Sequence, residues 1–189
     1  GLLQAHVDAH EAATEPTCFE GVALNMDKLQ WPISDAKCSP QVGKDPAHLS
    51  KLGWYYFLTG NCSILKDLFM KFGGFNMDFQ GYGWEDLELG YRLEQEKVPL
   101  RYLKTAKNYH YHVISEQKWI DINIQKGKSA QVMLKLHPEL KWFLGLNPIS
   151  RWAYRQISPT GKLYTFIKQR CYHAKTKWKH EFGYWFLKE

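Results

Sequence analysis

Apolar residues recur at the spacing of an α-helix in two stretches near the middle of the chain. The first predicts a helix that ends at Gly73–Gly74, because glycine readily adopts the left-handed conformation common after a helix. The second, residues 85–96, predicts a helix with Leu89 and Leu93 facing inward. The apolar positions of the first stretch are Ile64, Leu65, Leu68, Phe69 and Phe72, with Asn61 or Ser63 as the expected N-cap.

Shorter apolar runs predict three strands. These are residues 17–26, residues 53–58 and a run from Leu100 that leads to His110. Residues 27–53 are rich in proline, glycine, aspartate and serine, which is typical of loops. A strand at 53–58 would bury most of its aromatic side chains.

Helices are expected at both ends of the chain. Residues 2–13 predict one with an inward face, and His6 and His10 lie one turn apart on it. Such a pair can bind a metal ion, but no third ligand is evident, so a packing or solvent-exposed role is favoured. A second helical region begins at Ser115–Glu116, with an expected interruption at 126–128, and runs to Pro138. The inward face of the first helix is expected to hold Leu3, Val7 and Ala9 or His10.

The positive charge is concentrated near the C-terminus. Residues 140–189 contain ten Lys or Arg and two Glu, a balance of +8, so the rest carries −2 of the net +6. A basic helix packed on the domain is the favoured interpretation, and an amphipathic helix over 149–189 on anionic lipid is the alternative. No nucleic-acid-binding motif accompanies the basic residues, which argues against nucleic acid as a partner. The expected helix face comprises Leu163, Phe166, Ile167 and Cys171.

The cysteine pattern adds a weak indication of location. Cys18, Cys38, Cys62 and Cys171 show no CxxC spacing and no metal-binding pattern. Free thiols in a reducing, cytoplasmic compartment are therefore expected, and a Cys18–Cys38 disulfide is the less favoured alternative. No run of about 18 apolar residues is present. The expected location is cytoplasmic, with possible peripheral contact at the inner face of the membrane.

The segment Gly81-Tyr82-Gly83-Trp84-Glu85-Asp86 combines features of a ligand site. Its glycines allow close approach of the backbone, and its aromatic rings can face a sugar. Acidic residues at the start of a helix are common because they complement the helix dipole. The sharper hypothesis is a general base at a pocket floor, with its pKa lowered by the dipole and hence ionised at neutral pH.

The pattern FxTGNxS…FxKFGGFxxxFxGYGWEDLELGYRL…H resembles the C-terminal half of GT-A fold glycosyltransferases. It is most similar to family 2 enzymes and to the galactosyltransferase C-terminal segment of chondroitin-synthase-like and polypeptide N-acetylgalactosaminyltransferase-like enzymes. The resemblance covers about residues 15–115. It implies an α/β fold, α+β in this portion, and transfer of a sugar from a nucleotide-sugar, most readily a UDP-sugar, to a glycan or lipid-linked acceptor in polysaccharide or cell-envelope biosynthesis.

The resemblance also implies roles for individual residues. Asp86 corresponds to the catalytic base of an inverting, single-displacement reaction. His110, with His112 as second choice, corresponds to the ligand of a divalent metal, Mn²⁺ or Mg²⁺. The residues implied to bind the acceptor are Glu85, Trp84, Gly83, Tyr82, Asn61, Gly60 and Thr59.

One part of the family's pattern is missing. No Asp-x-Asp motif and no glycine-rich phosphate loop occur in the chain, and residues 1–14 resemble the helix that follows that motif. The chain is therefore expected to be a portion that lacks the donor-binding half and is inactive alone. Residues 1–115 are predicted to be the acceptor-side half of the domain, and 116–189 a basic helical extension. The alternative is a non-catalytic carbohydrate-binding or membrane-docking module that completes a site on another chain.

Overall fold

The computed structural model describes residues 1–189 except 27, 30, 41–45 and 158–189. It divides into two compact units, residues 1–133 and 134–189. The predicted boundary after residue 115 remains a prediction. The elements of the first unit are α1 (Leu2–Ala12), β1 (Cys18–Met26), β2 (Cys38–Pro40), β3 (Lys51–Leu52), β4 (Cys62–Ser63), α2 (Lys66–Lys71), α3 (Glu85–Gln95), β5 (Leu100–Tyr111) and α4 (Glu116–Leu136), whose last turn extends beyond it.

The first unit is built on a five-stranded mixed sheet. The strand order is β2-β1-β5-β3, and β4 also pairs with β1. The two long central strands, β1 and β5, run parallel, while the short strands pair with them in the antiparallel sense. A parallel strand pair whose two faces are covered by helices is typical of α/β proteins. The predicted α/β fold class is confirmed.

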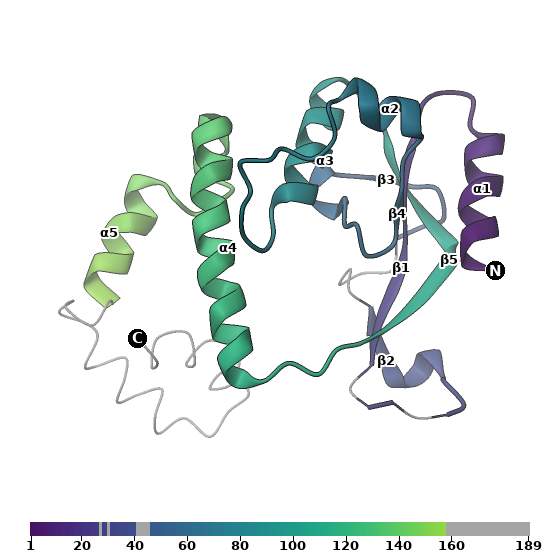
Figure 1. Cartoon of the computed structure of the whole chain (residues 1–189), viewed down its shortest axis with the longest axis horizontal. Helices are drawn as coiled ribbons and strands as arrows, with labels where there is room; N and C mark the ends of the chain where they lie inside the picture. Colours follow the sequence, from purple (N-terminus) through teal and green to yellow (C-terminus); the bar gives the residue numbers. More distant parts are fainter. Residues whose placement is uncertain (27, 30, 41–45, 158–189) are drawn as a thin grey trace. The chain divides into compact units, whose positions relative to one another are not determined.

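The two faces of the sheet carry separate apolar cores. Successive side chains of a strand point to opposite faces, so Cys18 and Val22 of β1 face one side and Phe19 the other. Figure 1 shows α1 on one side of β1 and β5, and α3 on the other. We call these sides the α1 face and the α3 face. The α3-face core includes Leu89, Leu93, Leu100 and Tyr102; the α1-face core includes Leu103, Ala106, Leu2, Ala5, Ala9 and Ala13.

An irregularity interrupts the β1–β5 pairing. Gly21 lies opposite Leu103, but Val22 lies opposite Lys107, so residues 104–106 of β5 have no counterpart on β1. The freed carbonyl oxygen of Ala106 accepts a hydrogen bond of 3.0 Å from Asn61 Nδ2. The Asn61 side chain lies so close to Gly21 that a Cβ at Gly21 would come within 2.4 Å of Asn61 Nδ2. Glycine is therefore required at position 21.

Asn61 is also bonded to α1 through a buried histidine. His6 Nε2 lies 3.0 Å from Asn61 Oδ1, which can only accept, so Nε2 carries the proton. His6 Nδ1 then accepts from the Ser63 hydroxyl at 2.7 Å, and His10 Nε2 lies 2.9 Å from the same hydroxyl oxygen. Burial, followed by the electrostatic interaction with His6, lowers the pKa of His10. Both histidines thus hold α1 to the sheet, which agrees with the favoured packing role.

Arg92 fastens α3 to the end of α2. Its guanidinium forms an ion pair with Glu88 at 2.9 Å and donates hydrogen bonds to the carbonyl oxygens of Phe72 and Gly74. Gly73 and Gly74 have φ values of +73° and +67°, which confirms that glycines end this helix in the left-handed conformation. The position of α3 is therefore fixed relative to the glycine turn.

Several sequence-based expectations for unit 1 are confirmed. The structure contains the predicted strand at β1, the predicted α3 with Leu89 and Leu93 fully buried, and the strand that carries His110. Cys18, Cys38 and Cys62 are free, as expected, whereas Cys171 lies outside the described residues. Burial raises the pKa of the Cys18 thiol to about 12.

Other expectations are wrong. Leu3 and Val7 are 80% and 47% exposed, because the side of α1 that packs on the sheet carries Leu2 and alanines instead. Residues 53–58 form no strand: Trp54–Tyr56 is a 3-10 turn, and its Tyr55 is exposed. The first central helix is shorter than predicted, since Cys62–Ser63 is strand β4 and Leu65 is the N-cap, without a side-chain cap bond.

Gly127 does not interrupt α4, which continues from Glu116 to Leu136. A single glycine in a helix costs about 1 kcal/mol relative to alanine, which a helix of 21 residues tolerates. The predicted end of this helix before Pro138 is confirmed.

The second unit contains a 3-10 turn at Pro138–Lys141 and α5 (Pro148–Ile157). The helix face predicted at Leu163, Phe166, Ile167 and Cys171 lies outside the described residues. Among the helices that the structure describes, none combines the length and the apolar character needed to cross a membrane.

Replacing Arg92 tests its role in placing α3. We expect Arg92→Ala to lower the free energy of unfolding by about 3 kcal/mol, because the buried Glu88 would lose its ion pair with Arg92. Urea unfolding monitored by circular dichroism measures the change. Arg101→Ala is the matched control, since its ion pair with Glu15 is exposed, and it should cost less than about 1 kcal/mol. Equal losses in the two variants would contradict the role of Arg92.

Candidate functional site

The loop before α3 has an unusual backbone conformation. Trp84, the N-cap residue of α3, has φ +77°, in the left-handed region that non-glycine residues rarely adopt. Gly83 before it has φ +85°. Strained residues of this kind occur frequently at ligand sites. The loop is irregular, as predicted, and it presents the indole at the start of α3.

Helix α4 holds this loop in place. Tyr82 N–H donates to Gln125 Oε1 at 3.1 Å, and the Ser129 hydroxyl donates to Tyr82 O at 3.3 Å. Lys126 Nζ lies 5.5 Å from the centre of the Tyr82 ring, within the range of a cation–π contact. The Tyr82 ring itself is half exposed. The sequence analysis did not identify these α4 residues, because nothing in their spacing relates them to the loop.

Asp86 lies in the first turn of α3 and is partly buried. Its Oδ1 accepts from Leu87 N–H at 2.8 Å, and the Thr59 N–H lies 3.5 Å from its Oδ2. Burial raises the pKa of Asp86, and the charge of Glu85 raises it further, although the backbone N–H groups oppose them. The expectation of a lowered pKa is therefore wrong, because loss of solvent outweighs the helix dipole. A raised pKa brings the carboxylate closer to the range of an effective general base.

Glu85 has unused hydrogen-bonding capacity. Its Oε2 is buried and has no hydrogen-bond partner. Buried polar atoms in proteins are usually paired, so an oxygen of this kind beside Trp84 can accept a hydrogen bond from a ligand hydroxyl. This agrees with the predicted role of Glu85 in binding an acceptor sugar, which remains a prediction.

The predicted acceptor residues of the 59–61 segment differ in what they contact. Thr59 reaches Asp86 through its backbone amide, and Gly60 O accepts a hydrogen bond of 2.9 Å from Asn108 Nδ2 on β5. Asn61 is buried, and both polar atoms of its side chain bond within the protein, to Ala106 and His6. The structure thus brings Thr59 to Asp86, whereas Asn61 joins strands and helix. A role of Asn61 in acceptor binding remains a prediction.

His110 and His112 lie side by side at the end of β5. Their ring centres are 5.3 Å apart, and both residues are exposed. Two neighbouring imidazoles fit part of a divalent metal site. Within the part of the chain that the structure describes, no group of three or more histidine, cysteine or acidic side chains is arranged to hold a metal. A complete ligand set would therefore need further groups, and the metal roles remain predictions.

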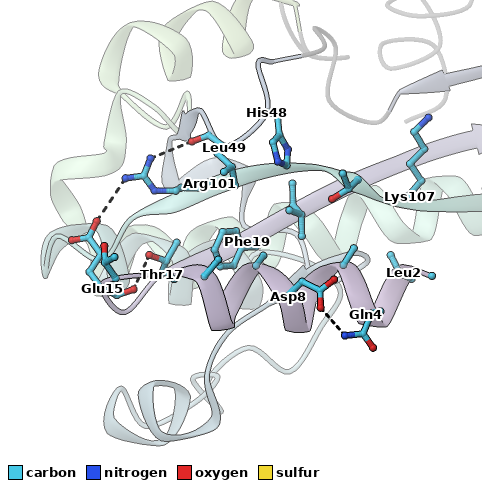
Figure 2. Close-up of a pocket in the computed structure, with 18 residues that line it drawn as sticks. Leu2, Gln4, Asp8, Glu15, Thr17, Phe19, His48, Leu49, Arg101 and Lys107 are labelled. Carbon is cyan, nitrogen blue, oxygen red and sulfur yellow. Dashed lines mark hydrogen bonds and ion pairs between the residues drawn. The ribbon is translucent and has the colours of Figure 1, made fainter.

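A separate cavity of about 800 Å³ lies on the α1 face. Figure 2 shows it between α1 and β5, with Arg101 reaching Glu15 and the Leu49 carbonyl at its rim. None of the predicted site residues lines it. We place the candidate site at Asp86 because the reactive groups meet there, whereas the cavity wall beside α1 consists largely of alanine and paired charged residues.

Glu20 is a buried carboxyl residue near this site that the sequence analysis missed. It is 1% exposed, and the charge of Asp86 influences its pKa. One feature of the sequence pointed to it: a lone acidic residue inside the apolar run of residues 17–26. Glutamate is rarely fully buried without a specific partner.

Comparison with known proteins matches part of the chain to glycosyltransferases. Residues 45–116 match a family model described as the N-terminal domain of galactosyltransferase. Validoxylamine A glucosyltransferase of Streptomyces hygroscopicus subsp. jinggangensis is 47% identical over 47 residues, which are 25% of this chain and 11% of that protein. Chondroitin synthase of Pasteurella multocida is 28% identical over 118 residues, 58% of this chain and 12% of that protein. No solved structure gives a significant match.

The matches thus cover about a tenth of the length of each relative. The model's description names an N-terminal domain, so assignment of this segment to a C-terminal half remains a prediction. The matched residues include Thr59, Trp84, Glu85, Asp86 and His110. The resemblance to glycosyltransferases is confirmed: residues 45–116 are similar to a galactosyltransferase domain and lie within a mixed α/β fold.

Proposed function

We propose that this chain forms the acceptor-binding part of a metal-dependent, inverting glycosyltransferase. The observation that supports this most directly is the partly buried Asp86 carboxyl, placed between the strained Trp84 and the Thr59 amide. The donor is a nucleotide-sugar, most simply a UDP-sugar, and the acceptor is a glycan or lipid-linked sugar. The printed names of the relatives, a glucosyltransferase and a chondroitin synthase, agree with sugar transfer.

In this proposal, Asp86 removes the proton from the attacking acceptor hydroxyl. The hydroxyl oxygen forms a bond to the anomeric carbon, while the bond from that carbon to the diphosphate breaks and the diphosphate leaves with the electron pair. Attack from the side opposite the leaving group inverts the configuration. Trp84 stacks on an acceptor sugar ring, and the unpartnered Glu85 Oε2 accepts from one of its hydroxyl groups. These contacts hold the reacting oxygen near Asp86.

The metal proposal concerns His110, with His112 as second choice. Their adjacent imidazoles would hold Mn²⁺ or Mg²⁺ together with ligands from the donor-binding half and the donor's phosphates. When bound, such an ion neutralises the negative charge of the leaving diphosphate.

The first test removes the base. In the longest native form of the enzyme, Asp86→Asn is expected to lower kcat about 1000-fold, because the amide cannot accept the hydroxyl proton. Binding of the nucleotide-sugar, measured by calorimetry, should be retained. Asp67→Asn, an exposed acidic residue in the first turn of α2, is the matched control and should leave turnover unchanged. Normal turnover by Asp86→Asn would exclude the base role.

The second test concerns pH. A base must be deprotonated, so kcat should fall as pH falls through the pKa of Asp86 in the enzyme–substrate complex. Because the charge of Glu85 raises that pKa, Glu85→Gln should move the acidic limb of the kcat profile to lower pH. Glu96→Gln, at the far end of α3, is the control. An acidic limb that stays in place in Glu85→Gln would show that another group controls it.

A peripheral membrane contact is a second proposal, and α5 supports it. Ile149 and Trp152 lie on one side of this helix and are each 65% exposed. Arg151 and Arg155 lie one turn apart and flank this apolar side, since Arg155 follows Trp152 by three residues. A helix with aromatic and basic faces suits the surface of an anionic membrane. We propose that the protein acts at the cytoplasmic face of the membrane, where lipid-linked acceptors are accessible.

Vesicle co-sedimentation tests this contact. The 189-residue chain is expected to bind vesicles rich in anionic lipid more strongly than neutral ones, and less strongly as salt rises. The double variant Ile149→Ala, Trp152→Ala should weaken binding severalfold. Trp31→Ala, which removes an exposed indole in the first unit, is the matched control. Equal binding to neutral and anionic vesicles would contradict the proposal.

A further inference from the structure

A second carboxyl group lies close to Asp86, at Glu20 in the centre of the sheet. Glu20 is 1% exposed and pairs with Cys62 of β4. It lies on the α3 face, because Cys18 and Val22, two positions away on either side, belong to the α3-face core. A buried carboxyl group is unfavourable unless its hydrogen-bonding capacity is used. Its partners therefore indicate its role.

Two consecutive backbone amides connect Glu20 with Asp86. Leu58 N–H donates to Glu20 Oε2 at 3.1 Å, and the next amide, Thr59 N–H, lies 3.5 Å from Asp86 Oδ2. The same residues begin a tight turn, closed by a 3.2 Å hydrogen bond from Asn61 N–H to Leu58 O. Because the two amides are one residue apart in a closed turn, a displacement of Leu58 moves Thr59 as well.

We propose that Glu20 positions Asp86: by binding the Leu58 amide, it fixes the turn whose next amide faces the Asp86 carboxylate. The Cys62 thiol bonds to the same Glu20 carboxyl group, which ties it to β4 as well. The catalytic consequence rests on the proposed function of Asp86. The coupling between the two carboxyl groups is independent of that function.

The charge state of Glu20 agrees with this role. Burial raises the pKa of Glu20 to about 9, although the hydrogen bonds from Leu58 and Cys62 oppose it, and the charge of Asp86 acts in the same direction as burial. Among the other titratable groups nearby, burial also raises the pKa values of the Cys62 and Cys18 thiols. Glu85 precedes Asp86 in the chain, and its charge raises the pKa of Asp86. At neutral pH, Glu20 is therefore uncharged and holds the turn without repelling the Asp86 carboxylate.

An NMR titration of the ¹⁵N-labelled 189-residue chain tests the coupling. The amides of Leu58 and Thr59 are followed from about pH 5 to about pH 10, which brackets the pKa of Glu20. Both are expected to shift with a common midpoint near pH 9. The transition should disappear in Glu20→Gln, whose side-chain oxygen still accepts from Leu58 N–H. In Asp86→Asn its midpoint should fall, because the charge that raises the Glu20 pKa is removed.

Three outcomes would overturn the proposal. They are a transition in Leu58 without one in Thr59, the same transition in Glu20→Gln, and no transition in either amide of the wild-type chain. Thermal unfolding gives a second measurement. The folded chain retains a proton on Glu20 that the unfolded chain releases above its ordinary pKa, so wild-type stability should fall relative to Glu20→Gln as pH rises toward 9. A constant difference would also contradict a protonated Glu20.

Turnover by the longest native enzyme separates this inference from the proposed function. Glu20→Ala is expected to lower kcat about 10- to 100-fold with a smaller change in KM for the acceptor, because a displaced base reacts poorly. Glu20→Gln should retain most of kcat. Normal turnover by Glu20→Ala would overturn positioning while leaving Asp86 as the base. Normal turnover by Asp86→Asn, with the amide coupling intact, would overturn the proposed function instead.

Discussion

The hydrogen bonds of Asn61 hold together the parts of the first unit that surround Asp86. Its side chain bonds to Ala106 of β5 and to His6 of α1, and its backbone oxygen accepts from Gly21 N–H of β1 at 2.7 Å. All of these groups are removed from solvent, where an unpaired polar atom is costly. The segment just before Asn61 carries the amides that face Glu20 and Asp86. The geometry of the candidate site thus depends on the hydrogen bonds of the buried Asn61.

Two opposing effects act on the carboxyl groups of this site. The start of a helix favours negative charge, which is why acidic residues in the first turn of α3 were expected to be readily ionised. Burial disfavours that charge, and for Asp86 and Glu20 burial is the larger effect. The two groups differ in depth: burial raises the pKa of the deeper Glu20 to about 9, and it also raises the pKa of the more exposed Asp86. A difference in solvent access, rather than in residue type, separates their properties.

The sequence predicted the elements whose pattern is local and periodic. Helix α3 was found from Leu89 and Leu93, and the glycine turn from Gly73–Gly74, because these signals lie within one element. The errors concern tertiary packing. Residues 53–58 are apolar enough for a strand but form a 3-10 turn with Trp54 buried, and α1 packs on the sheet mainly through alanines, with Leu2 at its start. Close packing of this kind leaves no periodic signal of large apolar residues.

The residues of the candidate site also divide into those that a local pattern identifies and those that only tertiary contacts bring together. Asp86, Glu85 and Trp84 are consecutive and form one motif, so a local pattern identifies them. Glu20 and Thr59 come close to Asp86 through pairing of distant segments, which no single stretch of sequence encodes.

The three residues of β5 without counterparts on β1 determine which side chains share a face at the end of the strand. Before them, odd-numbered residues such as Leu103 face α1; from Ala106, the last of the three, even-numbered residues do so. An odd number of extra residues reverses the alternation of a strand. Asn108 and His110 lie opposite Ala23 and Asn25 of β1 and therefore continue the face of Ala106. The number of unmatched residues at 104–106 thus determines which face of the sheet His110 occupies, several residues later in the chain.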